Sequence, residues 1–423
     1  MAESRVRSEI NIRSEIGRLE AVILHTPGAE VENMTPENAE RALYSDILNL
    51  SVVQQEYSQL EKVLDKVART YQVRALLKDI LENEKVKHNI ISAICENENL
   101  NGVRSQLMEL DAANLATQLI EGVVMEKDTL TKFWSQQRYS LMPLHNFFFT
   151  RDAAVAIRDK VLISRMANRV RERESIIMEA IFDYHPDFIT TTVNPYREKV
   201  LPKETRIEGG DVLVARDDVF LIGIGSRTSP QGVDLLLERI KKIGERRYVI
   251  VQELPHKPES FIHLDMVFTF LNTHECMVYE PVILKPNRLQ TVMITIDNGR
   301  VAGIQEQDNL LTALTSLGFD LEPLFCGGSR DEWIQEREQW HSGANFFAFA
   351  PGKVIGYARN VYTMEELSNH GYAIIPAADV ISGKTDPDSV EKCAVTLDGS
   401  ELPRGGGGAR CMTMPIIRQP VSW

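Results

Sequence analysis

The chain has 423 residues, 43% of them hydrophobic, and a formal net charge of −13 at pH 7. This length and apolar content suffice for a core without disulfides, and the five scattered cysteines contain no CxxC pair, which argues against a disulfide framework and a thiolate zinc site. The negative charge disfavours nucleic acid as a partner and mildly favours a cationic ligand. With neither a signal-peptide pattern nor a membrane-spanning apolar run, we expect a cytoplasmic protein.

The first predicted elements are a strand and a helical region. Residues 19–26 form an apolar run that ends at Pro27-Gly28, which is typical of a strand followed by a turn. From about residue 36 to residue 132, apolar residues instead recur at helical spacing, as in Leu60, Val63, Leu64 and Val67. This pattern predicts a helical bundle over 36–132, inserted after the first strand, with its acidic positions forming a solvated face.

Beyond the helical region, four segments share one pattern of an apolar run, a tight turn and a second apolar run. They span 154–164, 212–225, 266–279 and 346–357. Three of them precede a helical pattern, at 175–182, 233–243 and 364–370. We therefore predict β-hairpins in a repeated ββα-type unit, within a single catalytic α/β domain over 1–423. The segment around Cys411 is expected to supply a partner for the first strand.

Polar residues stand beside predicted strands at four places. These are NFFFTRD at 146–152, IEGGD at 207–211, FIHLD at 261–265 and the glycine-rich RGGGGARC at 404–411. Buried carboxylates are costly unless they are paired, so each one needs a structural partner or a cationic ligand. His263 and Asp265 are two positions apart and would face the same side of an extended strand.

A cysteine, a histidine and carboxylates are the components of thiol catalysis, namely a nucleophile, a proton carrier and charge partners. Cys411 follows four consecutive glycines, whose backbone permits close approach, and it is the candidate nucleophile. The plainer alternative is a flexible loop with an incidental cysteine. Taken singly, Asp152 could pair with a neighbouring arginine and Glu208 could cap a turn. His263 with Asp265 is weak evidence for a metal site, and no metal is expected.

The motif series resembles that of arginine deiminase, in the same order. The similarity is carried by FTRD, EGGD, HLD followed by VFT, REQW at 337–340 and the loop ending in RCM, with SEIG at 14–17 and HTPG at 25–28. It spans nearly the whole chain, and the helical insertion distinguishes arginine deiminases from smaller guanidine-modifying enzymes. The resemblance implies the pentein fold, a pseudo-fivefold α/β propeller with the active site at its centre.

The resemblance also implies a role for each site residue. Cys411 would be the nucleophile and His263 the general acid and base, with Glu208 orienting it, while Asp152 and Asp265 would hold the guanidinium through paired N–H to carboxylate bonds. Arginine would yield citrulline and ammonia through a covalent thiouronium intermediate, without a metal or organic cofactor. The amino-acid end of the substrate is expected at Asn146, Phe149, Arg171 and Arg227. Of these, Arg171 is the least specific, because Arg169 and Arg173 lie beside it.

One position departs from the family pattern. Arginine deiminases usually carry an arginine five residues before the nucleophile, where this chain has Gly406, although Arg404 is retained. A small guanidino substrate, with L-arginine as the first choice, is therefore expected, but strict selectivity for free arginine is not implied. The alternatives are an amidinotransferase, a deiminase of agmatine or peptidyl-arginine, and a guanidinium-binding sensor without activity. No nucleic-acid or membrane partner is expected, and a homo-oligomer is left open.

Overall fold

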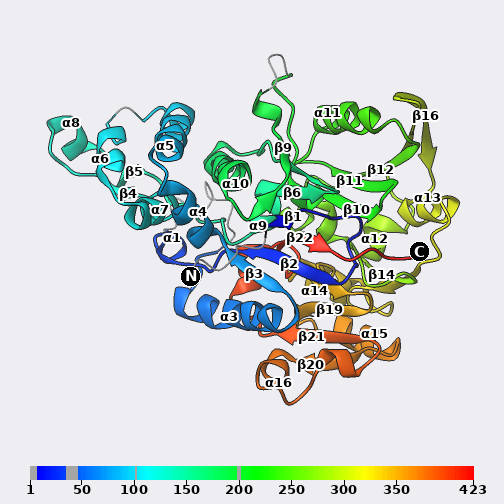
Figure 1. Ribbon diagram of the computed structural model, residues 1–423. Coiled ribbons are helices and arrows are strands. Elements are labelled where there is room, and N and C mark those ends of the chain that lie inside the picture. Colours follow the sequence, from blue (N-terminus) through cyan, green and yellow to red (C-terminus); the bar gives the residue numbers. More distant parts are fainter. Residues whose placement is uncertain (1–6, 35–45, 101, 198–201) are drawn as a thin grey trace.

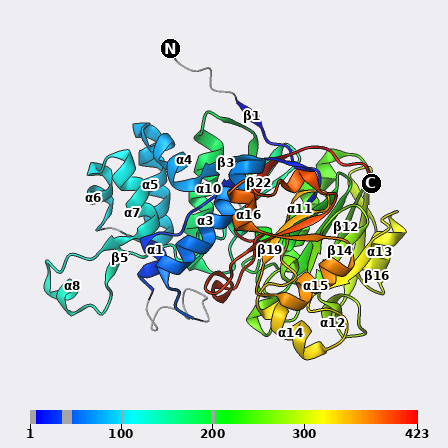
Figure 2. The same ribbon diagram turned by 90° about the horizontal axis from the view of Figure 1, so that it is seen from below.

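Figure 1 shows the computed structural model, which describes residues 7–34, 46–100, 102–197 and 202–423. The chain forms a mixed α/β body from which a helical arm projects on one side (Figures 1 and 2). Across the described ranges, no helix combines the length and the apolar character that crossing a membrane would require.

Five sheets within the described residues share one pairing pattern, in which two antiparallel strands are followed by a third strand parallel to the second. One of them joins the two ends of the chain, because β22 (Met414–Arg418) pairs with β2 (Leu19–Leu24), and β2 pairs with β3 (Arg69–Gln72). The expected pairing of the segment around Cys411 with the first strand is thus confirmed.

The other four sheets contain the predicted hairpins, all of which are present in antiparallel register. Two sheets are extended, one by β15 (Thr291–Asp297) and β16 (Arg300–Gln307), the other by β20 (Ala373–Pro376). The strands of the four sheets are β6 (Ala154–Ile157), β7 (Lys160–Ile163) and β9 (Thr191–Val193); β10 (Val212–Arg216), β11 (Val219–Ile224) and β12 (Arg247–Glu253); β13 (Phe268–Phe270), β14 (Glu275–Val278) and β17 (Glu322–Phe325); and β18 (Phe347–Ala350), β19 (Lys353–Tyr357) and β21 (Cys393–Leu397).

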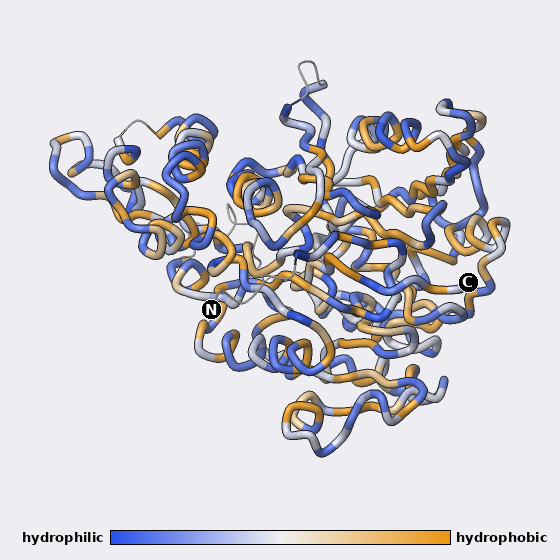
Figure 3. Tube along the Cα trace, in the orientation of Figure 1, coloured by the Kyte–Doolittle hydropathy of each residue, from blue (hydrophilic) through white to orange (hydrophobic). Residues whose placement is uncertain are grey.

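The helical patterns after three hairpins are confirmed as α10 (Glu172–Tyr184), α11 (Pro230–Ile240) and α15 (Val361–Asn369). Each crossover helix lets the chain return to add the parallel strand. Strands β13, β14, β18, β19 and β21 are buried along their whole length, and Figure 3 shows hydrophobic stretches gathered along the strands inside the body. The remaining helices of the body are α1 (Ala29–Glu32), α3 (Leu50–Val67), α9 (Thr150–Ala153), α12 (Glu280–Ile283), α13 (Leu310–Ser316), α14 (Glu332–Trp340) and α16 (Ala377–Ile381).

The stretch predicted as one helical bundle, 36–132, is distributed over two parts, and its start lies outside the described residues. Helix α3 and strand β3 belong to the body, because β3 pairs with β2 and α3 is the crossover between these parallel strands. The projecting arm consists of α4 (Val73–Leu81), α5 (Glu84–Glu98), α6 (Arg104–Glu109), α7 (Ala112–Glu121), β4 (Val123–Val124), α8 (Leu130–Trp134) and β5 (Tyr139–Leu141).

The arm supports the start of α10, directly after the predicted site residue Arg171, which ends the 3-10 turn η1 (Arg169–Arg171). Asn97 donates a hydrogen bond from Nδ2 to Glu172 Oε2 at 2.6 Å, and Glu98 forms an ion pair with Arg173 at 3.0 Å. The arm thus fixes the element that brings Arg171 to the site.

Candidate active site

The predicted site residues converge on one pocket. All of them except Glu208 and Asp265 contribute to its lining, namely Asn146, Phe149, Asp152, Arg171, Arg227, His263 and Cys411. Glu208 and Asp265 are fully buried behind this lining, next to His263 and Cys411 respectively. Residues that lie up to 265 positions apart, from Asn146 to Cys411, therefore meet at one place.

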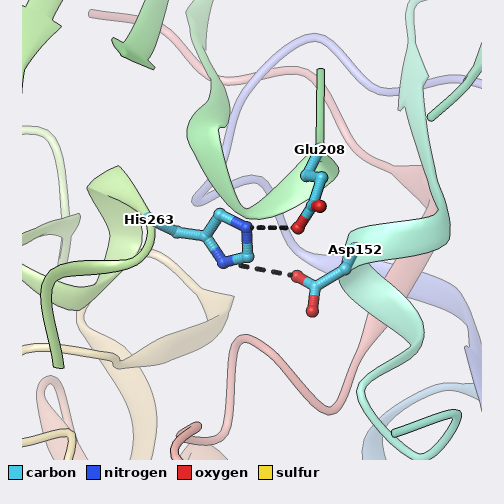
Figure 4. Close-up of side chains that lie close together, drawn as sticks. All are labelled: Asp152, Glu208 and His263. Atoms are coloured by element: carbon cyan, nitrogen blue, oxygen red, sulfur yellow. Dashed lines mark hydrogen bonds and ion pairs between the residues drawn. The ribbon is translucent and has the colours of Figure 1, made fainter. Parts of the chain in front are cut away.

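The imidazole of His263 lies between two carboxylates (Figure 4). Its Nε2 is 2.9 Å from Glu208 Oε2, and its Nδ1 is 3.6 Å from Asp152 Oδ1. Burial alone would lower the pKa of His263, but the charges of Asp152 and Glu208 outweigh it and raise the pKa to about 9. Burial would raise the pKa of Glu208, but Arg227 and His263 hold it at about 2. His263 is therefore a protonated acid at neutral pH.

Cys411 is held by a tightly packed glycine loop. A Cβ on Gly407 would lie 2.5 Å from the Phe149 ring, and one on Gly408 would lie 2.6 Å from Asn345 Oδ1, so only glycine allows this approach. Asn345 Oδ1 accepts hydrogen bonds from the backbone N–H groups of Arg410 and Cys411, at 3.0 and 3.2 Å. The thiol is thereby fixed at the pocket wall and is only 3% exposed.

The surroundings of the thiol disfavour its ionisation in the unliganded protein. Cys411 Sγ lies 3.7 Å from Asp265 Oδ2. Burial, together with the negative charges of Asp265 and Asp152, raises the pKa of Cys411 well above its ordinary value. A cation placed between the two carboxylates would remove this unfavourable charge.

Each of the two aspartates accepts a hydrogen bond from an arginine with one oxygen and makes no hydrogen bond with the other, although Asp152 Oδ1 lies 3.6 Å from His263 Nδ1. Asp152 Oδ2 accepts from Arg171 Nη1 at 2.7 Å, and Asp265 Oδ2 accepts from Arg410 Nη1 at 2.8 Å. The Oδ1 atoms of Asp152 and Asp265 are buried and have no hydrogen bond. Buried acceptors are rarely left unsatisfied, so these oxygens indicate a place for a donor-rich ligand.

The two cations of the pocket differ in how they are held. Arg171 is buried and bonded to Glu174 as well as Asp152, with Nη2 to Glu174 Oε2 at 2.8 Å. Arg227 is 12% exposed, and its Nη1 lies 4.0 Å from Glu208 Oε1. Both line the pocket beside the Asp152 and Glu208 carboxylates, where a ligand carboxylate would find positive charge.

Sequence reasoning missed several supporting residues. Arg410, which is hydrogen-bonded to Asp265, also donates from Nε to Glu15 Oε2 at 3.0 Å. Glu15 lies in the SEIG motif, to which the sequence assigned no function. Trp340, in the REQW motif, lines the pocket. Asn345 had no distinguishing signal, because nothing in its neighbourhood indicates that its side chain meets a loop 65 residues away.

Among the described residues, Asp152, Glu208 and His263 also lie close enough together to hold a metal ion. The charges around them disfavour it. Arg171 already binds Asp152, Arg227 lies beside Glu208, and His263 has a raised pKa, so a divalent cation would meet three positive groups. The donor set thus suits a hydrogen-bonding cation better than a metal.

The fold is shared with solved structures of enzymes that act on guanidino compounds. DDAH from Pseudomonas aeruginosa, a mutant complexed with citrulline, matches with a TM-score of 0.50 and 14% identity over 94% of this chain and 99% of that one. SxtG, an amidinotransferase from Microseira wollei, matches at 0.53 and 12% over 98% of both chains. The N-terminal domain of ArgZ, covalently bonded to a reaction intermediate, matches at 0.52 and 12% over 94% and 98%. These neighbours have the pentein fold, and the α/β class is confirmed.

Sequence comparison is more specific. Arginine deiminase from Levilactobacillus brevis is 33% identical over 98% of this chain and 100% of that protein. The enzyme from Oenococcus oeni is 32% identical over 98% and 99%. The family model described as arginine deiminase matches residues 40–418. The chain belongs to the arginine deiminase family.

Proposed function

We propose that this protein hydrolyses L-arginine to L-citrulline and ammonia through a covalent intermediate on Cys411. The observation that carries the proposal is the pair of buried oxygens without a hydrogen bond, Asp152 Oδ1 and Asp265 Oδ1, beside the Cys411 thiol and the protonated His263. A guanidinium is planar and presents forked N–H donors, so it can satisfy two carboxylates at once. Its central carbon would then face the sulfur.

The substrate cation would also activate the nucleophile. Its positive charge offsets Asp152 and Asp265, whose charges add to the effect of burial in raising the pKa of Cys411, so the thiol releases its proton to water as the guanidinium binds. The thiolate then adds to the guanidinium carbon. His263 gives its proton to the departing nitrogen, ammonia leaves, and an S-alkylthiouronium remains on Cys411.

Hydrolysis would complete the reaction. His263, now neutral, takes a proton from water, and the resulting hydroxide adds to the carbon of the thiouronium. The carbon–sulfur bond breaks, Cys411 is released, and the ureido group of citrulline is formed. Glu208, at 2.9 Å from Nε2, keeps the imidazole oriented through both proton transfers.

We also propose that the five like-patterned sheets are the blades of a pseudo-fivefold propeller around this site. Support comes from their common pairing pattern and from the sheet that joins β22 to β2, which brings the two chain ends into one unit. A cytoplasmic location, a homo-oligomeric state and a catalytic domain spanning 1–423 with an insertion at 36–132 stay predictions.

Replacing Asp152 or Asp265 with asparagine should impair deimination severely. Each change removes one charged acceptor for the guanidinium, a loss of about 2–5 kcal/mol in transition-state stabilisation for a buried charge pair. The fold should persist, because Arg171 keeps Glu174 and Arg410 keeps Glu15. Steady-state kinetics with arginine and with agmatine should show the loss for both substrates; a loss confined to arginine would place these carboxylates at the amino-acid end.

The amino-acid end of the substrate is proposed to lie near Arg171 and Arg227. Arg404 and Arg410, the two other arginines of the loop, have other partners: Arg404 forms ion pairs with Asp46 and Glu401, and Arg410 with Glu15 and Asp265. Gly406 lines the pocket, and, its two adjacent residues aside, no heavy atom of the described residues lies within 4 Å of the place where its Cβ would stand. The loop thus offers space rather than charge at this position, and we expect modest discrimination between arginine and agmatine.

Gly406→Arg is expected to lower the KM for arginine but not for agmatine, since a new charge-assisted hydrogen bond contributes on the order of 1.5–3 kcal/mol. Gly406 has φ of +88°, so any side chain there should also lower the melting temperature. Gly406→Ala is the matched control, because it adds the backbone strain without the charge. Strong rejection of agmatine by the wild-type protein would show that the missing arginine has no consequence.

Ionisation of Cys411 can be tested without substrate. Because its pKa is raised well above the ordinary value, alkylation by iodoacetamide should accelerate continuously as the pH rises from 7 through 9. Peptide mass spectrometry distinguishes Cys411 from the other four cysteines. A rate that levels off below pH 8 would instead reveal a thiolate already present in the free protein.

The proposed substrate is tested by incubating the protein with arginine, agmatine and a peptidyl-arginine and analysing the products by mass. Citrulline should form from arginine whether or not glycine or ornithine is added. A product that appears only with such an amine would support the amidinotransferase alternative. The amidinotransferase SxtG shares the fold of this chain. Binding of arginine without any product would support the sensor.

A further inference from the structure

The IEGGD motif contains a second buried carboxylate for which the proposed mechanism has no role. Asp211 ends the short 3-10 turn η3 (Gly209–Asp211) that begins after Glu208, and it is completely buried. Its Oδ1 accepts a hydrogen bond from the backbone N–H of Leu264 at 2.9 Å, and its Oδ2 has no hydrogen-bond partner. An ionisable group in this setting is costly, so a function is expected for it.

Asp211 and Glu208 hold the neighbouring turn at two points. The Glu208 carboxylate is hydrogen-bonded to the His263 ring. The Asp211 carboxylate accepts from the backbone N–H of the next residue, Leu264. Leu264 begins η6 (Leu264–Met266), the turn that contains Asp265. The two carboxylates of one motif thus fix the orientation of both His263 and Asp265.

The glycines around Asp211 show how closely these parts are packed. A Cβ on Gly210 would lie 2.5 Å from His263 Nδ1, and a Cβ on Gly223 would lie 2.3 Å from Asp211 Oδ1. Neither position has room for a side chain. Thr228 lies beside both carboxylates: its hydroxyl accepts from Glu208 N at 3.1 Å, and its proximity offsets part of the rise that burial causes in the pKa of Asp211.

We propose that Asp211 is a positioning residue of the site, which holds the turn between His263 and Asp265 and supplies negative charge behind the imidazole. The charge adds to that of Asp152 and Glu208, the other carboxylates facing His263, while Arg171 and Arg227 face the same group of carboxylates from the pocket. All three carboxylates help to keep His263 protonated. Burial raises the pKa of Asp211 itself to about 7, so its charge is present in the pH range where His263 titrates, and Asp211 does not line the substrate pocket. The expected effect of Asp211 on turnover rests on the proposed function, whereas its expected effect on the pKa of His263 does not.

The test compares Asp211→Asn with the wild-type protein. Asparagine has the same shape and can still accept from Leu264 N, so the variant should fold, but it removes the charge. The titration of His263 is followed by NMR of histidine labelled at Cε1, with His263→Asn identifying the resonance. Asp218→Asn, a partly exposed aspartate in the turn between β10 and β11, is the matched control.

We expect the pKa of His263 to fall by about one unit in Asp211→Asn, the size of effect that one nearby charge produces. The kcat for arginine should fall about tenfold or more while KM changes less than about threefold, because proton transfer and not binding is affected. Thr228→Val, which removes the hydroxyl between Asp211 and Glu208, should shift the pKa in the same direction.

An unchanged His263 titration in folded Asp211→Asn would overturn the proposal. If Asp211→Asn does not fold, Thr228→Val decides by the same measurement, with an unchanged titration again contrary to the proposal. A shifted titration in a protein that does not convert arginine would leave the role of Asp211 intact and contradict the proposed function instead.

Discussion

Cys411→Ala is expected to reduce kcat for arginine to less than about 10⁻⁴ of the wild-type value, because the Cys411 sulfur is the atom that forms the covalent intermediate. The fold should remain, since two hydrogen bonds that do not involve the sulfur fix the loop. Asn345 Oδ1 accepts from Arg410 N, and the Tyr357 hydroxyl donates to Gly407 O. Arginine should still bind, because Asp152 and Asp265 are unchanged. Ammonia release, isothermal calorimetry with arginine and a thermal melt measure the three properties.

Cys95→Ala is the matched control for this variant. Cys95 is also buried, but it lies on α5 in the helical arm and not at the pocket. It should keep wild-type turnover, apart from a small loss of stability from the removed sulfur. Substantial ammonia release by correctly folded Cys411→Ala would remove the covalent mechanism.

His263→Asn should reduce turnover by several orders of magnitude. Both the departing nitrogen and the attacking water need the proton carrier, and each proton transfer typically accounts for a factor of about 10²–10⁴. Asparagine is polar and smaller, so it can occupy the place between Glu208 and Asp152. Single-turnover experiments with rapid acid quenching and intact mass analysis show whether the block lies before or after the adduct on Cys411.

His256→Asn controls for the loss of a histidine, because His256 is exposed and lies outside the pocket. It should behave like the wild-type protein. If His263→Asn kept near-native activity, His263 would serve packing alone, and the proton carrier would have to be sought elsewhere in the pocket.

The hairpins could be predicted because alternating apolar runs and tight turns are local patterns. Strand β3 was not found for the same reason, since its RTYQ sequence is short, polar and partly exposed and becomes a strand only by pairing with β2. The hairpin of β15 and β16 was also missed, although Asn298-Gly299 between two alternating runs is a strong hairpin signal, and both residues have positive φ.

The candidate site was predictable as a set of residues but not as a set of contacts. The motifs pointed to Cys411, His263 and the carboxylates, and the structure brings them to one pocket. The pairing of Arg410 with Asp265 joins residues 145 positions apart, and no local pattern reveals it. Arg171, expected only as a substrate contact, is also bonded to Asp152 Oδ2, which leaves Asp152 Oδ1 for the substrate.

The central claim is that the protein hydrolyses a C–N bond at the guanidinium carbon of arginine, and isotope labelling tests it most directly. The protein is incubated with L-arginine in water enriched in ¹⁸O, and the products are quantified by mass spectrometry. We predict equimolar citrulline and ammonia, with the label in the ureido oxygen of citrulline. Ornithine formed together with an amidino-bearing product, or no conversion by the folded protein, would contradict the account.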